Sequence, residues 1–241
     1  MSEKEINSLS NKVRHIGVIM DGNRRWAKSK GLELFIGHKK GAETTKLIVK
    51  TAVEEKIEYL TLYAFSSENW KRPEAEIKDL MELLKYFLKN EINSLVKNGI
   101  KLKILGDLSL FSNEIKENIQ LAISKTRNNT KLNLILAINY GSRQEITNSI
   151  KIILNNVKNK KLNLEDVNEE LVSNSLYTGG LPDPDLIIRT GGDSRLSNFL
   201  LWQSAYSELI FVDKPWPDFN KKDFLSALYE YKSRERRFGG C

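Results

Sequence analysis

Cysteine is nearly absent from the 241 residues of this chain, and long hydrophobic runs are absent altogether. The one cysteine, Cys241, is the last residue, which excludes a disulfide-stabilised scaffold. No uninterrupted apolar run approaches the ~20 residues that a membrane-spanning helix needs. The first residues, MSEKEINSLSNK, are polar and mixed in charge, unlike a signal peptide. We therefore expect a cytoplasmic protein.

Excess charge is confined to two short segments. The formal net charge is +7; residues 21–46 contain seven Lys/Arg against three Asp/Glu, and residues 231–241 contain four against one. Such local excesses indicate an anionic partner, which is a nucleic acid, a lipid surface or a phosphorylated small molecule. A solubilising surface bias is the alternative interpretation. Ordinary apolar (40%) and aromatic (9%) contents exclude a disordered chain.

Short apolar segments alternate with helical ones along the whole chain. Each apolar segment is bounded by Gly, Asp, Asn or Pro, as is typical of strands buried on both faces of a sheet. The predicted strands cover residues 15–20, 59–65, 100–105, 132–138, 185–190 and 208–213. The predicted helices cover residues 38–56, 74–97, 112–127, 143–158, 165–175 and about 220–233.

This alternation predicts an α/β fold. We expect a single domain with a mostly parallel central β-sheet of about six strands, flanked by helices and joined by right-handed crossovers. No repeat, low-complexity linker or composition break divides the chain, so the domain is expected over 15–241, after a polar extension at 1–14. Ligands of such sheets bind beyond the carboxyl ends of the strands, which directs attention to the polar residues there.

The first strand is followed by Asp21-Gly22-Asn23-Arg24-Arg25-Trp26. Gly22 permits a tight turn, and Asn23 is expected to cap the next helix, whose free N–H groups favour an anion. Asp21 is placed to hold a divalent metal such as Mg²⁺ through oxygen. The guanidinium groups of the tandem Arg24 and Arg25 can each donate two hydrogen bonds to phosphate oxygens. A plain Asp-Gly turn is the alternative.

Two further strand ends are rich in polar groups. The second strand is followed by SSENWKRP (66–73), a loop able to close over a ligand and exclude water, or an ordinary loop with a capping serine. The fifth is followed by two arginines, Arg189 and Arg195, flanking a Gly-Gly turn whose N–H groups suit an anion. Ser197 is expected to cap a helix beginning near Asn198. Arginine at three strand ends suggests one site for more than one phosphate.

These motifs resemble those of one protein family. The chain contains, in order between about His15 and Gly240, HIGVIMDGNRRWAK, GHKKGAE, LTLYAFSSENWKRP, INYGSRQEI, DLIIRTGGDSRLSNFLLWQSAYSEL, WPDF and RERRFGG. They are similar to motifs of the cis-prenyltransferases, most closely the bacterial undecaprenyl diphosphate synthases. Several long motifs at family spacing are far more specific than a lone glycine-rich loop, and the resemblance implies the fold of that family.

The resemblance implies a prenyl-transferring enzyme. Members couple C1 of an allylic diphosphate, here expected to be farnesyl or geranyl diphosphate, to C4 of isopentenyl diphosphate, lose a proton from C2 and form a cis double bond. The resemblance also implies Mg²⁺, a homodimer in which RERRFGG approaches the partner's site, and undecaprenyl diphosphate as a lipid carrier for cell-wall assembly. Because such a product must leave for a bilayer, we expect peripheral contact with the inner face of the membrane.

Motif positions also imply residue roles. Asp21 matches an aspartate that binds Mg²⁺ and assists departure of the allylic diphosphate, and Glu208 matches a second carboxylate near the metal. Asn69 and Arg72 match residues that act in the condensation step. The positions that match substrate-binding residues are Gly22, Asn23, Arg24, Arg25, Trp26, His38, Ser66, Ser67, Glu68, Trp70, Arg189, Arg195 and Ser197.

The family places its product tunnel between the helix predicted at 74–97 and the central strands. Packing in the core is the simpler interpretation of the apolar residues there, and the sequence does not separate the two roles. The residues that are candidates for both are Ala64, Leu84, Phe87, Leu88, Leu132 and Leu134. His15, at the start of a strand, is interpreted as structural.

The chain departs from the family pattern at four positions. Members usually carry an arginine that contacts the allylic diphosphate where this chain has Leu34, and Arg24, Lys28, Lys30 or Lys39 are candidates to replace it. The other departures are Lys46 where arginine is common, Ser142 where glycine is common, and Ser194 where histidine occurs.

Two alternatives remain beside a long-chain synthase. Leu34 keeps open a cis-prenyltransferase with a short or branched product. The other alternative is a non-catalytic prenyltransferase subunit, or a phosphate- or nucleic-acid-binding protein, but the Asp-Gly-Asn motif and the arginine clamp that such subunits lose are intact here. Nucleic-acid binding requires a continuous basic face with exposed aromatics. The arginines instead follow strands, among glycines and carboxylates, so no nucleic-acid partner is expected.

Overall fold

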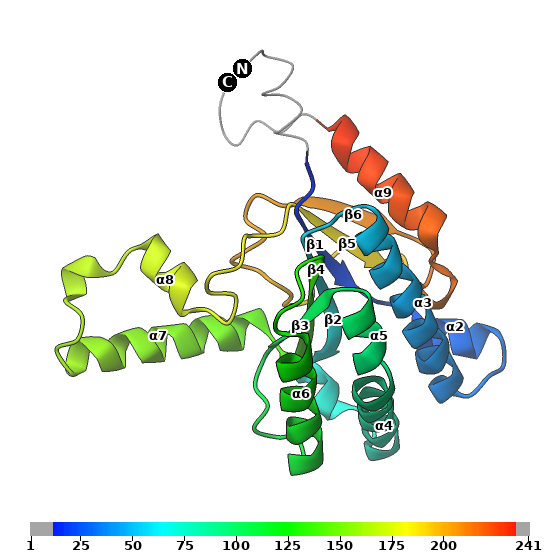
Figure 1. Cartoon of the computed structure of the whole chain (residues 1–241), viewed down its shortest axis with the longest axis horizontal. Helices are drawn as coiled ribbons and strands as arrows, with labels where there is room; N and C mark the ends of the chain where they lie inside the picture. Colours follow the sequence, from blue (N-terminus) through cyan, green and yellow to red (C-terminus); the bar gives the residue numbers. More distant parts are fainter. Residues whose placement is uncertain (1–11, 235–241) are drawn as a thin grey trace.

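Six parallel strands form one sheet in the order β3-β4-β2-β1-β5-β6. The computed structural model describes residues 12–234 (Figure 1), so most of the predicted N-terminal extension lies outside the described residues. The strands are β1 (His15–Ile19), β2 (Tyr59–Ser66), β3 (Ile100–Leu105), β4 (Leu132–Tyr140), β5 (Leu186–Thr190) and β6 (Glu208–Val212). All six predicted strands are confirmed, and the sheet is parallel throughout rather than mostly so.

Helices join the strands and cover the sheet. The α-helices are α2 (Asn23–Ser29), α3 (Leu34–Glu54), α4 (Glu74–Asn90), α5 (Ile92–Lys97), α6 (Asn113–Thr126), α7 (Ser142–Lys158), α8 (Glu169–Ser175) and α9 (Lys221–Ser233). The 3-10 helices are η1 (Ser67–Lys71), η2 (Leu164–Asp166) and η3 (Trp216–Asp218). None of the described helices combines the length and hydropathy needed to cross a bilayer.

Three helix predictions need correction. The helix predicted at 165–175 is interrupted at residues 167–168, between η2 and α8. The helix predicted at 74–97 is divided at Glu91, which ends α4 and begins α5, and whose carboxylate accepts a hydrogen bond from Lys46 of α3 (2.5 Å). No helix begins near Asn198, because Ser197, Asn198 and Leu200 adopt positive φ angles of 48°, 64° and 44° and form an irregular turn. Hydrophobic periodicity does not reveal these local backbone changes.

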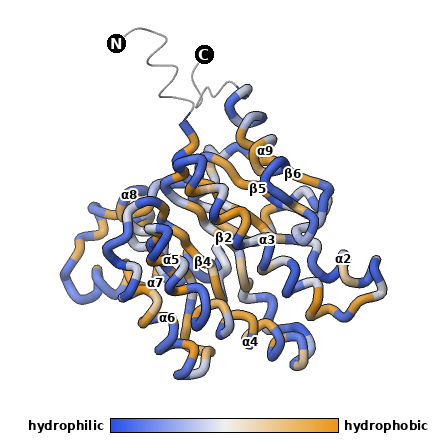
Figure 2. Tube along the Cα trace, turned by 45° about the vertical axis from the view of Figure 1, so that its right-hand side comes forward, coloured by the Kyte–Doolittle hydropathy of each residue, from blue (hydrophilic) through white to orange (hydrophobic). Residues whose placement is uncertain are grey.

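The two faces of the sheet are covered differently. One face packs under α3, α4, α5, α6 and α9 and forms the larger hydrophobic core. The other face carries a smaller core, closed by the buried Phe199 and Leu200 of the irregular turn and by residues near Tyr177 and Leu181. In Figure 1, α7 and α8 extend away from the body. Hydrophobic residues concentrate along the strands, as Figure 2 shows.

Burial of the strands follows their place in the sheet. All five residues of β1 and of β5 are buried, as predicted for strands covered on both faces. The edge strand β6 was expected to be buried in the same way, but Phe211 is exposed and only Ile210 is buried. An edge strand has a neighbour on one side alone, so its side chains are less enclosed.

The order of the strands locates a switch point. From β1 the chain proceeds to β2 on one side, and it later returns to β5 on the other side of β1. In open α/β sheets ligands bind beyond the carboxyl ends of the strands at such a point. Here that position lies between the ends of β1 and β5.

His15, at the opposite end of β1, is buried and uncharged. Its Nδ1 lies 2.7 Å from the carbonyl oxygen of Pro182, so this nitrogen carries the proton, and Nε2 accepts from the hydroxyl of Thr61 (2.7 Å). Burial lowers the pKa of His15 to about 4. The structural interpretation of this residue fits these contacts.

The buried His15 makes stability depend on pH. Its pKa is about 6.5 in the unfolded chain and lower in the folded one, so stability is lost as the pH falls through 6.5 toward 4. From urea unfolding at pH 7.5 and pH 5, we expect this residue to remove about 2 kcal/mol of unfolding free energy at the lower pH. His15→Gln lacks the titrating ring, and an equal loss in the variant and the native protein would contradict the prediction.

Candidate functional site

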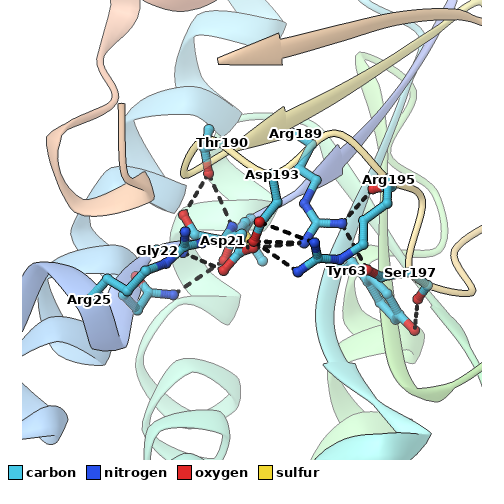
Figure 3. A network of polar contacts seen from close by, with 11 residues as sticks. Asp21, Gly22, Arg25, Tyr63, Arg189, Thr190, Asp193, Arg195 and Ser197 are labelled. Atoms are coloured by element: carbon cyan, nitrogen blue, oxygen red, sulfur yellow. Dashed lines mark hydrogen bonds and ion pairs between the residues drawn. The ribbon is translucent and has the colours of Figure 1, made fainter. Parts of the chain in front are cut away.

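Asp21 and Arg189 form an ion pair at the switch point. Arg189 Nη2 donates to Asp21 Oδ2 (2.8 Å), and the guanidinium is 4% exposed (Figure 3). The Thr190 hydroxyl donates to the carbonyl of Asp21 (2.8 Å), and the amide of Asp21 donates to the same hydroxyl oxygen (3.0 Å). These contacts fix the end of β1 against the end of β5.

Gly22 turns the chain from β1 into α2. Its φ of 103° is strained for other residues, and a Cβ here would lie 2.7 Å from the Cβ of Pro215. Gly22, rather than Asn23, occupies the N-cap, so the predicted capping role of Asn23 is wrong. The Asn23 amide instead donates to the carbonyl of Met20 (3.3 Å), and its Oδ1 is buried without a partner.

A second carboxylate, Asp193, shares arginines with Asp21. Arg25 Nη2 lies 3.1 Å from Asp21 Oδ2 and 3.2 Å from Asp193 Oδ2. Arg195 lies 3.0 Å from Asp193, and Arg189 lies 3.5 Å from it (Figure 3). Burial by itself raises the pKa of Asp21, but the Arg189 hydrogen bond and the charge of Arg25 outweigh it, and the pKa lies below its usual value. Asp21 is therefore ionised at neutral pH.

The structure brings Arg189, the backbone of Arg195 and Ser197, the residues of the predicted clamp, into contact. Arg189 Nη1 donates to the hydroxyl of Ser197 (2.7 Å) and to the carbonyl of Arg195. Ser197 caps no helix, contrary to the prediction, because the irregular turn replaces the expected helix there. Its hydroxyl instead faces the guanidinium of Arg189.

Glu76, in the first turn of α4, is surrounded by two arginines and a histidine. Arg72 Nη1 donates to Glu76 Oε1 (2.8 Å), and His38 Nε2 and Arg24 Nε each lie 3.6 Å from the same oxygen. The residue is 7% exposed, and its Oε2 has no hydrogen-bond partner. Burial and the charge of Arg72 lower the pKa of His38. The His38 ring is therefore neutral at pH 7.

A polar cavity of about 490 Å³ joins the two groups. Five cationic side chains line it, together with two carboxylates and the turn after β1. Its lining residues are Met20, Asp21, Gly22, Asn23, Arg24, Arg25, Lys28, His38, Arg72, Asp193 and Arg195. A dianionic group placed here meets guanidinium groups from α2, from the segment before α4 and from the turn after β5.

An apolar cavity under the sheet adjoins the polar cavity. Met20, Asn23 and His38 line both, and the apolar cavity then runs along β2 and β4 under α3 and α4. Of the predicted tunnel residues, Ala64, Leu84 and Phe87 line it. A further cavity of about 340 Å³ shares Thr45 and Phe87 with it and extends to α5.

The other three tunnel candidates have different places. Leu88 and Leu132 are buried in the core and line none of these cavities. Leu134 lines the further cavity. Leu132 and Leu134 are two residues apart on β4 and face the same side of the sheet, so they differ in their place along the strand, which composition alone does not reveal.

Sequence comparison identifies the family to which the chain belongs. A family model described as "Putative undecaprenyl diphosphate synthase" matches residues 19–239, nearly the whole chain. The chain belongs to this family. The match covers the turn after β1, the segment between β2 and α4 and the turn after β5, which are the three segments that surround the polar cavity.

Relatives of the enzyme are named isoprenyl transferases. The chain is 51% identical to the isoprenyl transferase of Clostridium perfringens over 98% of this chain and 94% of that protein. It is 48% identical to that of Agrobacterium fabrum, over 93% and 91%. These matches support a prenyl-transferring enzyme.

Solved structures share the fold. Lavandulyl diphosphate synthase from Lavandula x intermedia, solved in complex with dimethylallyl diphosphate, superposes with a TM-score of 0.92 at 34% identity, over 95% of this chain and 99% of that one. A "probable undecaprenyl diphosphate synthase" from Campylobacter jejuni gives 0.78 at 38% identity, also over 95% and 99%.

The loop after β2 contributes less to the cavity than predicted. Of its residues only Arg72 lines the polar cavity of the enzyme. Asn69 Oδ1 accepts from the amide of Ser66 (3.0 Å). Trp70 packs against Phe65 and Phe111 and donates to Asn139 Oδ1 (2.9 Å).

Three other predicted residues have contacts outside the polar cavity. Trp26 donates to Asp218 Oδ1 (2.7 Å) in η3. Ser67 lines a separate cavity of about 540 Å³ together with Trp70. Glu68 Oε1 accepts from Asn198 Nδ2 (2.9 Å) in the turn that contains the clamp.

Glu208 lies at the other end of the sheet from Asp21. Glu208 begins β6 and pairs with Leu186 of β5, which in turn pairs with Ile16 of β1. Ile16 is five residues before Asp21, so Glu208 and Asp21 are separated by roughly 15 Å along the strand direction. The carboxylate of Glu208 accepts from Arg234 Nη1 (2.6 Å). One chain therefore does not form the two-carboxylate metal site predicted from Asp21 and Glu208. The rest of the RERRFGG motif, from residue 235, lies outside the described residues.

The donor set beside the switch point fits a metal that arrives with a diphosphate. No cluster of three His, Cys, Asp or Glu suited to a metal occurs within residues 12–234. Asp21 and Asp193, however, share arginines at one wall of the polar cavity. Mg²⁺ commonly binds through one or two carboxylates, with substrate phosphates and water completing its shell.

The sequence motifs did not identify two residues of the site, Asp193 and Glu76. A carboxylate directly after Gly-Gly at the end of a strand is the signal that could have indicated Asp193. Glu76 lies four residues after Arg72, a spacing that permits an ion pair on a helix. Glu76 is buried by residues of α2 and α3, and the sequence around Glu76 does not predict that these helices lie beside it.

We expect Glu76→Gln to destabilise the enzyme by about 2 kcal/mol, because Arg24 and Arg72 lose a buried counter-charge. Glu74→Gln, an exposed change in the same helical turn, serves as the matched control. Urea unfolding at pH 7.5 measures both. Equal unfolding free energies for the two variants would show that the buried carboxylate is not structurally required.

Proposed function

We propose that the enzyme condenses isopentenyl diphosphate with an allylic diphosphate, farnesyl or geranyl diphosphate, to give a Z-polyprenyl diphosphate. One observation carries the proposal: a cavity lined by five cations shares Met20, Asn23 and His38 with a neighbouring apolar cavity. A ligand that fills both has an anionic head and a hydrocarbon tail. An allylic prenyl diphosphate has that form.

The arrangement offers places for two diphosphates on either side of Asp21. Arg24, Lys28 and Arg72 line the polar cavity, and Arg24 and Arg72 lie beside Glu76 next to His38, where the allylic head group is proposed to lie. Arg189 and Arg195, with Ser197, form the clamp proposed for isopentenyl diphosphate. In this conformation Asn69 is hydrogen-bonded to Ser66, so its proposed part in the condensation requires the loop to move.

The proposed reaction breaks the bond between C1 and the diphosphate of the allylic substrate and joins C1 to C4 of isopentenyl diphosphate. The departing diphosphate takes the electron pair, and a proton leaves C2. Arg24, Arg25 and Arg72 stabilise the charge on the leaving group. Asp21 and Asp193 would hold Mg²⁺, which supplies further charge neutralisation at the departing oxygens.

The length of the apolar path favours a long product, proposed to be undecaprenyl diphosphate for cell-wall assembly. The apolar cavity and the further cavity share Thr45 and Phe87 and together extend from His38 to α5. A short product is the second candidate, and the TM-score of 0.92 to lavandulyl diphosphate synthase favours it. A homodimer, and peripheral contact with a membrane where a long product leaves, belong to the proposal.

Labelled isopentenyl diphosphate, incubated with Mg²⁺ and either farnesyl or geranyl diphosphate, tests the proposal. We expect incorporation of label into long chains, sized by chromatography. A product that contains only one added isopentenyl unit would favour the short-chain enzyme over the long-chain synthase. No incorporation with either primer would overturn both.

Asp21→Ala is expected to lower kcat by at least ~100-fold, because a carboxylate that would hold Mg²⁺ at the leaving group is lost. The fold is expected to persist, as judged by circular dichroism. Asp166→Ala, an exposed change in η2, is the control and should retain activity. Near-native turnover of the Asp21 variant would remove the carboxylate from the proposed mechanism.

Lys28 is proposed to replace the arginine missing at position 34. Of the four candidate replacements, Arg24 and Lys28 line the polar cavity, whereas Lys30 lies 5.1 Å from the centre of the Trp26 ring. We expect Lys28→Ala to raise KM for farnesyl diphosphate about 5-fold with little change in kcat, as for loss of uniform binding. Lys39→Ala, outside that cavity, is the control, and Leu34→Arg is expected to restore KM in the Lys28 variant. An unchanged KM in the Lys28 variant would contradict this replacement.

A further inference from the structure

Asn198 connects three segments that are distant in the sequence. Its Nδ2 donates to Glu68 Oε1 of η1 (2.9 Å), and its Oδ1 accepts from the amide of Arg143 in α7 (2.9 Å). Its carbonyl accepts from the amide of Ser142 (2.8 Å). One residue thus joins the turn that contains the clamp, the loop after β2 and the start of α7.

The chemistry of this position requires an asparagine. The same side chain must donate to a carboxylate and accept from a backbone amide, and a carboxamide does both. The backbone φ of Asn198 is 64°, a conformation that asparagine and aspartate adopt more readily than most residues. An aspartate here keeps the acceptor toward Arg143 but places a second carboxylate against Glu68.

Close approach of the three segments is built into the backbone. A Cβ on Gly141 would lie 2.6 Å from Ser67 Oγ and 2.7 Å from Asn198 Nδ2. Glycine at this position therefore lets η1 and the turn after β5 meet at the end of β4. On the other side of Asn198, the buried Phe199 stacks on Tyr63 at 4.6 Å and anchors the turn to the sheet.

We propose that Asn198 is a positioning residue, whose contact with Glu68 ties the loop after β2 to the clamp and sets the clamp's affinity for a diphosphate. The neighbouring residue, Ser197, accepts from Arg189, so a displaced turn moves the clamp directly. Arg24 and Lys28, which line the polar cavity, make none of these contacts. The inference rests on the proposed function only in naming isopentenyl diphosphate as the ligand of the clamp.

Exchange of the two polar groups tests this inference. Asn198→Asp places a carboxylate against the carboxylate of Glu68. Glu68→Gln alone removes the charge of Glu68. In the double variant the amide of residue 68 can donate to the carboxylate of residue 198, so a donor and an acceptor face each other again with their positions reversed. Calorimetric titration of isopentenyl diphosphate, without an allylic substrate, measures the clamp. We expect Kd to rise about 10-fold in Asn198→Asp and to return within about 3-fold of the native value in the double variant.

Two controls separate positioning from general destabilisation. Asn129→Asp removes side-chain donors to the carbonyls of Leu95 and Ile100, away from the cavity, and should lower the melting temperature without changing Kd. Binding of an unreactive thiolo analogue of farnesyl diphosphate should change less than about 2-fold in Asn198→Asp. Equal weakening of both ligands, or a double variant no better than Asn198→Asp, would overturn the inference.

Inorganic pyrophosphate separates this inference from the proposed function. If the native protein binds pyrophosphate but makes no prenyl product, the proposed reaction fails. The same series of variants then tests Asn198 with pyrophosphate as the probe. A native pyrophosphate affinity in Asn198→Asp would overturn the positioning role, whatever the reaction of the enzyme.

Discussion

The ion pair between Asp21 and Arg189 is the contact on which the rest of the site depends. It joins the ends of β1 and β5 at the point where the sheet changes its direction of growth. Arg189 is buried, so its charge needs a counter-charge, and Asp21 supplies it at the wall of the polar cavity. The turn after β1 and the clamp after β5 are therefore held in a fixed relation before any ligand binds.

The site combines two environments that meet at His38. On one side are guanidinium groups, and on the other are aliphatic and aromatic side chains under the sheet. A protonated histidine at this boundary would place a charge beside hydrocarbon, but burial and Arg72 keep the ring neutral. Met20 and Asn23 line both cavities as well, so uncharged side chains form the boundary between the charged and the apolar environment.

The strands and the strand-end residues were predictable from the sequence, because apolar runs of strand length and the rule for parallel sheets are local signals. Asp21, Arg189 and Arg195 were found in this way. Glu76 and the contacts of Asn198 depend on neighbours far along the chain, and no local pattern encodes those neighbours. The separation of Glu208 from Asp21 likewise appears only when the register of β5 and β6 is known.

Both carboxylates of the polar cavity are already paired with arginine in the free enzyme, and so is the neighbouring Glu76. Asp21 and Asp193 pair with Arg25 and Arg189, and Glu76 pairs with Arg72. A dianion that entered the cavity would therefore exchange partners with these carboxylates instead of meeting unpaired arginines. The carboxylates keep the arginines in ordered positions and limit the attraction to unrelated anions. A ligand that replaces several of these ion pairs at once with its own contacts to the arginines is therefore favoured over a single small anion.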